Sequence, residues 1–171
     1  MNRIKIYEDD DTQSGLRHLE SRVIRFRPIG RVRCKFSEEE LRTKRSSIVS
    51  EVIIDPQYVQ ALDGVECYSH LFVIFYMHKV PLRGTRALKV HPRGRVDVEK
   101  VGVFATRNRN RPNPIGLAVV ELLERRGNSL KVRALDAVDG TPVLDIKPYD
   151  LIDVQKQVRV PKWWYAIRSP T

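Results

Sequence analysis

The segment VGVFATRNRNRPNPIGL, residues 101–117, constrains the fold of this chain more than any other stretch. Pro112 and Pro114 each fix their own φ at about −65° and donate no backbone N–H. Each proline also keeps the residue before it, Arg111 or Asn113, out of the helical region. We therefore expect a stiff, extended backbone here, which a helix cannot cross.

Apolar residues flank this stiff segment and predict a strand on either side of it. The first is VGVFA at residues 101–105, and Gly116 opens the second. Without a Cβ atom, Gly116 lets a ligand or another backbone come close. A loop that is stiff before binding can hold Arg107 and Asn113 at fixed spacing with little entropy left to lose. A proline-stiffened structural loop between two strands is the alternative interpretation.

A second compact motif, DIKPY, occupies residues 145–149. Side chains of an extended strand alternate between its two faces, so Asp145, Lys147 and Tyr149 would project to one side. Pro148 keeps Lys147 extended. An edge strand with a surface ion pair is the alternative, and such a pair stabilises a fold by only about 0–1 kcal/mol.

Alternation of apolar and polar residues predicts further short strands. The pair Gly127-Asn128 is typical of a hairpin turn between two of them. The chain shows neither strand–helix alternation nor a glycine-rich nucleotide loop, which argues against a doubly wound fold. We predict a mainly β, single-domain protein: a compact antiparallel β-barrel with short helices. The expected strands cover residues 23–32, 48–54, 65–78, 117–123, 129–137 and 142–146.

Two short helices are expected between these strands. The capping box S-x-x-E at residues 37–40 predicts a helix over residues 38–45. Asp55 as N-cap and Pro56 at the first helical position predict the start of a second helix. Gly64 is its expected end.

The composition favours an anionic partner. The chain of 171 residues has the length of one domain, and 31 Lys and Arg against 21 Asp and Glu give a net charge of +10. Such a balance is typical of nucleic-acid binding and also promotes solubility. Two cysteines exclude a disulfide framework, no apolar run approaches the roughly 20 residues that span a bilayer, and the N-terminus has no signal-peptide core. These features predict a soluble, cytoplasmic protein with no membrane partner.

The histidines predict neither a metal site nor a hydrolase. His70 and His78 would share one strand face, but their separation along the strand is about 26 Å at 3.3 Å per residue. Ser69 and His70 are neighbours, so on a strand they would point to opposite faces and form no dyad. We therefore expect no metal ligand set. The basic loop at residues 80–100 becomes a candidate for RNA contact.

Four segments resemble the signature of the TrmO (TsaA-like) methyltransferases. They are FATR…RPNPIGL, IGRVR at residues 29–33, YSHLFVIFYMH at residues 68–78 and DGTPVLDIKPY at residues 139–149. The resemblance covers roughly residues 26–149 and departs at residues 108–110, where many relatives carry a Ser-Pro-containing stretch. It implies a short form of the family: an N-terminal extension at residues 1–22, a β-barrel methyltransferase domain at residues 23–154 and a C-terminal tail at residues 155–171 that packs on the barrel.

The resemblance also implies an activity. The methyl donor would be S-adenosylmethionine, and the acceptor would be N6 of threonylcarbamoyladenosine at position 37, in the anticodon loop of tRNA. It further implies a homodimer with the donor site near the subunit interface. One alternative is the same donor with another small-molecule or RNA acceptor. Another is a non-catalytic basic β-barrel that binds single-stranded nucleic acid.

The resemblance and the chemistry of the side chains together suggest roles for individual residues, and the two sharp motifs are expected to face each other across one site. The candidate catalytic residues are Asp145, Lys147 and Tyr149. The carboxylate can accept a proton or bind the donor's ammonium, and the ring can stack on a base or face the sulfonium. The candidate donor-binding residues are Arg107, Arg111, Asn113, Pro114, Ile115, Gly116, Ser69 and His70. The candidate RNA-binding residues are Arg33, Arg86, Lys89, Arg93, Arg95 and Arg109.

Overall fold

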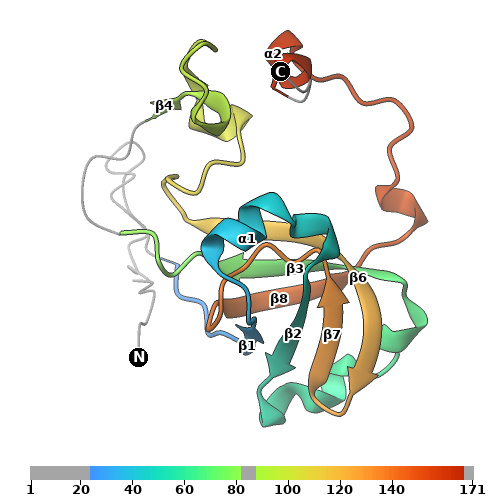
Figure 1. The fold of residues 1–171 in the computed structure, drawn as a ribbon. Coiled ribbons are helices and arrows are strands. Elements are labelled where there is room, and N and C mark those ends of the chain that lie inside the picture. The colour runs from blue at the N-terminus through green and yellow to red at the C-terminus, as the bar shows by residue number, and fades with distance from the viewer. Residues whose placement is uncertain (1–23, 82–87, 168–171) are drawn as a thin grey trace, which may run out of the picture.

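The computed structural model describes residues 24–81 and 88–167 of the chain. Within these residues, six strands close an antiparallel barrel in the order β1-β2-β7-β6-β3-β8 (Figure 1). The predicted fold class is therefore confirmed. The predicted extension at residues 1–22 lies outside the described residues. The barrel strands are β1 Gly30–Arg33, β2 Val49–Ile54, β3 His70–Tyr76, β6 Ile115–Arg126, β7 Ser129–Arg133 and β8 Pro142–Pro148.

The barrel core follows from the two-residue period of the strands. Leu71 and Val73 of β3 are fully buried, and so are Ala118 and Val120 of β6. The residues between them point to the outside of the barrel. All six strands contribute to the buried set: Val32, Val52, Ile54, Leu71, Val73, Phe75, Ala118, Val120, Leu130, Val132 and Val143.

Gly116 serves close packing inside this core. β3 and β6 pair Phe75 directly with Gly116, and a Cβ atom on Gly116 would lie only 2.2 Å from Cε2 of the Phe75 ring. The ring fills the space that the glycine leaves. What approaches Gly116 is thus an aromatic side chain, not the ligand or backbone expected from the sequence.

Strand β3 is shorter than predicted at both ends. The expected range was residues 65–78, whereas the strand covers His70–Tyr76. Residues Val65–Cys67 form the 3₁₀ helix η3, because Gly64 at φ 86° turns the chain left-handed just before it. The strand face expected to join His70 and His78 does not exist, since His78 lies beyond the strand.

Other strand boundaries also differ from prediction. β1 begins at Gly30 rather than in the proline-containing segment before it. The strand expected at residues 101–105 is only β5 (Val101–Gly102), followed by the 3₁₀ helix η5 (Val103–Ala105). β7 ends at Arg133, because Ala134 adopts a left-handed φ of 70° that ends the extended backbone.

The two predicted helices differ in outcome. α1 (Glu38–Thr43) begins at Ser37 with both hydrogen bonds of the capping box, as predicted, and the 3₁₀ helix η1 (Arg45–Ser47) follows it. The second segment, η2 (Pro56–Leu62), is a 3₁₀ helix, and the Asp55 side chain does not cap it. Asp55 is the N-cap residue and Pro56 holds the first helical position, as predicted, but the segment is a 3₁₀ helix rather than an α-helix.

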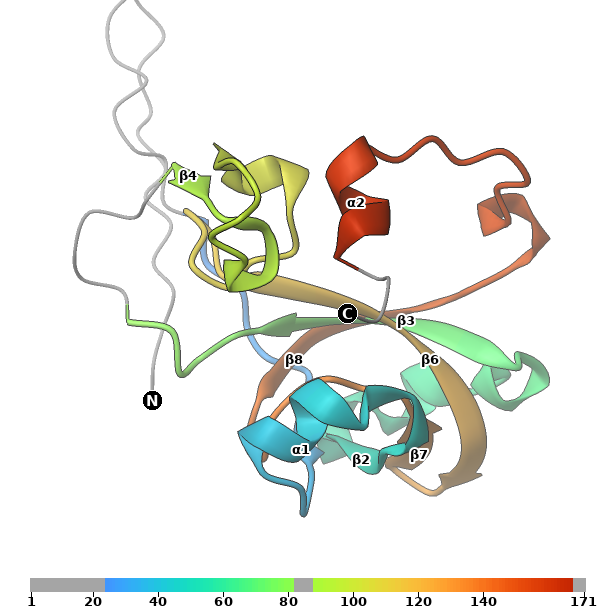
Figure 2. The same ribbon diagram turned by 45° about the horizontal axis from the view of Figure 1, so that its top comes forward.

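Two excursions leave the barrel on one side. β4 (Lys89–Val90) and β5 form a separate two-stranded sheet next to the 3₁₀ helix η4 (Pro92–Gly94). After β8, the chain forms η6 (Leu151–Asp153) and α2 (Lys162–Ala166). Figures 1 and 2 show both excursions on the side of the barrel formed by β3, β6 and β8. No side chain at the described tail positions 155–167 is buried, and packing of the tail on the barrel stays a prediction.

Candidate active site

The outer face of β8 and β3 brings the DIKPY side chains together. In the antiparallel register Asp145 pairs with Ile74, and Lys147 pairs with Phe72. Paired residues share a face of the sheet, so all four side chains lie outside the barrel. The Tyr149 ring packs edge-on against Phe72 at a centroid distance of 5.2 Å. An acid, a base and an aromatic ring therefore lie beside an apolar strip, as the motif predicts.

Asp145 and Lys147 form an ion pair on this face. Lys147 Nζ lies 2.8 Å from Asp145 Oδ2, and the other carboxylate oxygen accepts the backbone N–H of Ile146 at 2.9 Å. The two side chains are 44% and 61% exposed, so the pair is worth only about 0–1 kcal/mol of stability. A charged group of a ligand can therefore replace either partner of this ion pair at little energetic cost.

Ser69 and His70 lie next to Tyr149. The Tyr149 N–H donates to the His70 carbonyl at 3.0 Å, and the two rings are 6.3 Å apart. Ser69 Oγ lies 3.0 Å from His70 Nδ1. The prediction that these neighbours point apart is wrong, because Ser69 precedes β3 and is not part of the strand.

An apolar stripe continues the site across β6. Ile115, Leu117 and Val119 point outward and are 40%, 52% and 39% exposed. Leu117 pairs with Ile74, so the stripe adjoins the face that carries Asp145. We call these three residues the β6 stripe. Exposed apolar surface of this kind marks places where ligands or partners bind.

The proline-stiffened loop is anchored at one end of this face. Met77 N–H donates to the Pro114 carbonyl at 2.8 Å, and Ile115 N–H donates to the Asn113 carbonyl at 2.7 Å. The register nevertheless places Asn113 two strands away from Asp145 and several positions further along, a separation of roughly 15 Å. Within this chain Asn113 and Asp145 therefore do not touch, although β6 and β8 belong to the same sheet.

Several predicted RNA-binding residues already pair with acids of the same chain. Arg33 bonds Glu51 across β1 and β2, Arg95 binds Asp97 at 2.7 Å, and Arg109 reaches Glu38 of α1 at 3.2 Å. Lys89 and Arg93 are exposed in the β4–β5 excursion. Arg107 is exposed in the loop before β6, and Arg86 lies outside the described residues.

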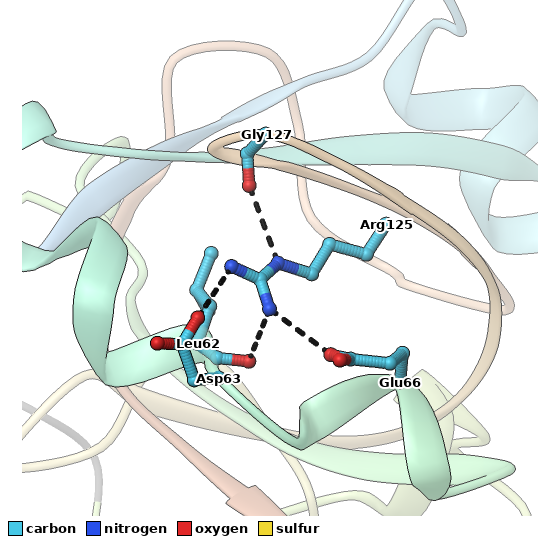
Figure 3. Close-up of polar contacts among 5 residues, drawn as sticks. All are labelled: Leu62, Asp63, Glu66, Arg125 and Gly127. Atoms are coloured by element: carbon cyan, nitrogen blue, oxygen red, sulfur yellow. Dashed lines mark hydrogen bonds and ion pairs between the residues drawn. The ribbon is translucent and has the colours of Figure 1, made fainter.

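Arg125 is a structural residue that the sequence pattern did not reveal. Its guanidinium donates to the Leu62 carbonyl at 3.0 Å, to Asp63 at 2.9 Å and to Glu66 at 3.0 Å (Figure 3). The hydrogen bonds that Arg125 donates to Asp63 and then to Glu66 raise its pKa. Only 18% of the arginine side chain is exposed. This clamp ties the end of β6 to η2 and η3, and it exists because β6 extends past the predicted end at residue 123.

A cavity of about 610 Å³ opens beside this clamp, at the mouth of the barrel. Its wall consists of η2, η3 and the second half of β8, and Asp145 is part of it. Among the described residues no group of three or more His, Cys, Asp or Glu side chains is placed to hold a metal ion. No helix within residues 24–81 and 88–167 has the length and apolarity to cross a membrane.

Comparison with known proteins assigns the chain to a family. The sequence model described as the tRNA-methyltransferase O N-terminal domain matches residues 33–153. The chain belongs to this family. The resemblance noted in the RPNPIG and DIKPY motifs is thereby confirmed.

Three relatives illustrate the similarity. A probable S-adenosyl-L-methionine-binding protein of Methanothermobacter thermautotrophicus is 50% identical over 129 residues, 74% of this chain and 90% of the relative. The tRNA (adenine(37)-N6)-methyltransferase of Escherichia coli is 38% identical over 134 residues, 72% of this chain and 57% of the enzyme. The crystal structure of TrmO from Pseudomonas aeruginosa superposes with a TM-score of 0.67 at 30% identity, over 85% of this chain and 64% of that one. The chain thus spans little more than half the length of the E. coli enzyme.

Proposed function

We propose that this chain transfers a methyl group from S-adenosylmethionine to N6 of threonylcarbamoyladenosine at position 37 of tRNA. Family membership supports a tRNA methyltransferase, the archaeal relative's name supports the donor, and the E. coli enzyme's name supports adenine 37 and its N6 atom. The structural observation that carries the proposal is the outer face on which the Asp145–Lys147 pair and Tyr149 adjoin the β6 stripe. A tRNA substrate would place this activity in the cytoplasm.

The residues on this face fit the charges of the donor. When bound, S-adenosylmethionine supplies an electrophilic methyl group on a sulfonium, together with an ammonium and a carboxylate. The face of the Tyr149 ring can stabilise the sulfonium charge. Asp145 can accept hydrogen bonds from the ammonium, and an arginine such as Arg107 can bind the carboxylate through two hydrogen bonds. Holding donor and acceptor in line can lower the barrier by roughly 7–11 kcal/mol.

Asp145 is also suited to take up the proton that N6 loses. N6 forms its new bond to the methyl carbon as the carbon–sulfur bond breaks, and its proton must pass to a base. The Asp145 carboxylate is held by Lys147 at 2.8 Å, on a half-exposed surface where this contact is weak. A threonyl carboxylate on the base can bind Lys147 in its place, which frees Asp145 Oδ2 for the proton.

The basic residues of the β4–β5 excursion and the loop before β6 are the proposed RNA contacts. The intramolecular partners of Arg95 and Arg109 are exposed acids, so RNA phosphates can replace them. Lys89 and Arg93 are exposed on the same excursion. Figure 2 shows this excursion on the side of the barrel that carries the candidate site, so a bound anticodon arm would reach both.

We also propose that two copies associate through the β6 stripe, with the site near the interface. Leu117 is 52% exposed on the stripe, and Leu151 and Ile152 of the tail are 92% and 85% exposed. A second copy would cover this apolar surface and could bring its own Asn113 towards Asp145. Light scattering on the purified chain should give twice the monomer mass, and Leu117→Glu should reduce it to the monomer. A monomeric unsubstituted chain would contradict the proposal.

The test of the activity is nucleoside analysis of tRNA after incubation with S-adenosylmethionine. Two tRNA pools are compared, one that carries threonylcarbamoyladenosine and one that lacks it. The proposal expects the methylated nucleoside only from the first pool. Methylation of both pools, or of another nucleoside, would indicate a different acceptor. Binding of tRNA with no calorimetric signal for S-adenosylmethionine would indicate a nucleic-acid-binding barrel without catalysis.

A further inference from the structure

The cavity at the barrel mouth exists because β1 and β8 pair over a short distance only. β1 pairs Gly30 with Val143 and Arg31 with Pro142. The second half of β8 therefore has β3 on one side and the cavity on the other. The cavity of about 610 Å³ lies within the range of roughly 300–1,000 Å³ usual for ligand pockets, which often occur in barrel mouths.

The lining of the cavity suits a flat, neutral ring. Within residues 24–81 and 88–167 no lysine, arginine or histidine lines it, although the chain carries a net charge of +10, so a phosphate would find no counter-charge among these residues. Its polar groups are the tyrosines Tyr58 and Tyr68, the carboxylates Asp63 and Asp145 and the thiol of Cys67. Neither tyrosine hydroxyl has a hydrogen-bond partner within the described part of the chain. Aromatic rings with free hydroxyls beside carboxylates can stack on a purine and bind its ring nitrogens and amino group.

Asp145 connects this cavity with the outer face. Its Oδ1 atom accepts the N–H of Ile146, which places the carboxylate at the edge of β8, and its Oδ2 atom binds Lys147 on the outer face. The candidate donor-binding residues of β3, β6 and the loop before β6 lie on one side of β8, whereas the cavity lies on the other side. Ser69 precedes β3 and is the chain neighbour of Tyr68, which lines the cavity. A ring in the cavity would present its amino nitrogen to Asp145 opposite the donor.

We propose that the cavity receives the adenine ring of the acceptor nucleotide, turned out of the RNA stack. This inference rests on the proposed function. Enzymes that modify a base commonly extrude it into a pocket and stack it between aromatic side chains. The Arg125 clamp holds Leu62 and Asp63, which line the cavity, and also Glu66, so this wall is fixed before the base enters (Figure 3). The donor carries an adenine ring as well, and the experiment must distinguish the two.

The first test fills the cavity. Ala61 is exposed and lines the cavity, so Ala61→Trp adds a bulky ring there with little effect on folding. Gln60→Trp is the matched control, since Gln60 is an exposed neighbour on η2 that does not line the cavity. We expect Ala61→Trp to raise the KM for tRNA at least tenfold and to leave the calorimetric Kd for S-adenosylmethionine unchanged. A weaker donor Kd would assign the cavity to the donor's adenine, and unchanged values of both constants would show that no purine enters it. Either result overturns the proposal.

The second test needs no catalytic activity. Cys67 is exposed and lines the cavity, whereas Cys34 is buried, so N-ethylmaleimide should modify Cys67 first. Substrate tRNA without donor should slow this modification at least fivefold, and S-adenosylhomocysteine alone should not. Equal rates with and without tRNA, when filter binding shows the complex has formed, would contradict the inference. If tRNA protects Cys67 but the chain does not methylate tRNA, the proposed base pocket is supported and only the proposed methyl transfer is refuted.

Discussion

Replacing Gly116 with alanine tests how the barrel supports the outer face. An added Cβ would lie 2.2, 2.3 and 2.8 Å from three atoms of the Phe75 ring. That ring is only 4% exposed and packed in the core, so it cannot swing into solvent. Overpacking of this kind costs about 1–3 kcal/mol. For a chain of this size each kcal/mol lowers Tm by roughly 2–4 °C, which predicts a total decrease of about 2–12 °C.

Gly102→Ala is the matched control for this substitution. No atom of the described residues lies within 4 Å of a Cβ at Gly102, and its φ of −56° suits any residue. Alanine there should be neutral or stabilise the chain by about 0.4–1 kcal/mol, because it restricts the unfolded state. Urea titration and thermal scans of both variants measure the difference directly.

A double variant tests whether the cost of Gly116→Ala arises from its contact with the Phe75 ring. Phe75→Leu removes the ring and costs stability by itself, but Gly116→Ala should add much less to it than it does to the unsubstituted chain. A Gly116→Ala variant as stable as Gly102→Ala, or one whose cost is the same with and without the Phe75 ring, would refute the packing described here.

Three further outcomes are expected. Arg125→Met should lower the urea midpoint of unfolding, because hydrogen bonds to charged groups are lost and the Leu62 carbonyl loses its partner. Hydrogen bonds from Ser129 and then Arg33 lower the pKa of Glu51 below its usual 4.5. The ionised carboxylate therefore stabilises the fold above pH 4.5, and this stabilisation is lost as the pH falls through the lowered pKa. Glu51→Gln should make the free energy of unfolding less dependent on pH in this acid range. Arg93→Ser should weaken tRNA binding and reduce the slope of log K against log salt by about 1, and an unchanged slope would exclude this phosphate contact.

Most of the fold could be predicted from the two-residue period of apolar side chains along the strands. Alternation of apolar residues predicted the strands that contain Val73 and Val120, and the capping box at Ser37 predicted the start of α1. These features depend on local spacing, which a sequence displays directly. The DIKPY trio belongs to the same class, since its common face follows from strand geometry once β8 is extended.

The sequence revealed much less about contacts between distant segments. The Phe75 ring over Gly116 and the Arg125 clamp on η2 and η3 join residues far apart in the chain, and no local pattern indicates either one. The 3₁₀ helix before β3 was missed because a single left-handed residue, Gly64, overrides the apolar alternation that follows it. The barrel-mouth cavity likewise depends on where β1 stops pairing with β8, which is set by the closed barrel as a whole.

The catalytic role of Asp145 is tested most directly by the single-turnover rate of methyl transfer in Asp145→Asn, at saturating tRNA and S-adenosylmethionine. Asp136→Asn is the matched control, because Asp136 is a similarly exposed aspartate paired with Arg45 at 3.2 Å and lies outside the site. Loss of a general base lowers a rate by about 10²–10⁴-fold, so Asp145→Asn should be slower by at least a hundredfold while tRNA retention stays near normal and the control keeps its rate. A rate for Asp145→Asn equal to that of Asp136→Asn would contradict the assignment of the reaction to this carboxylate.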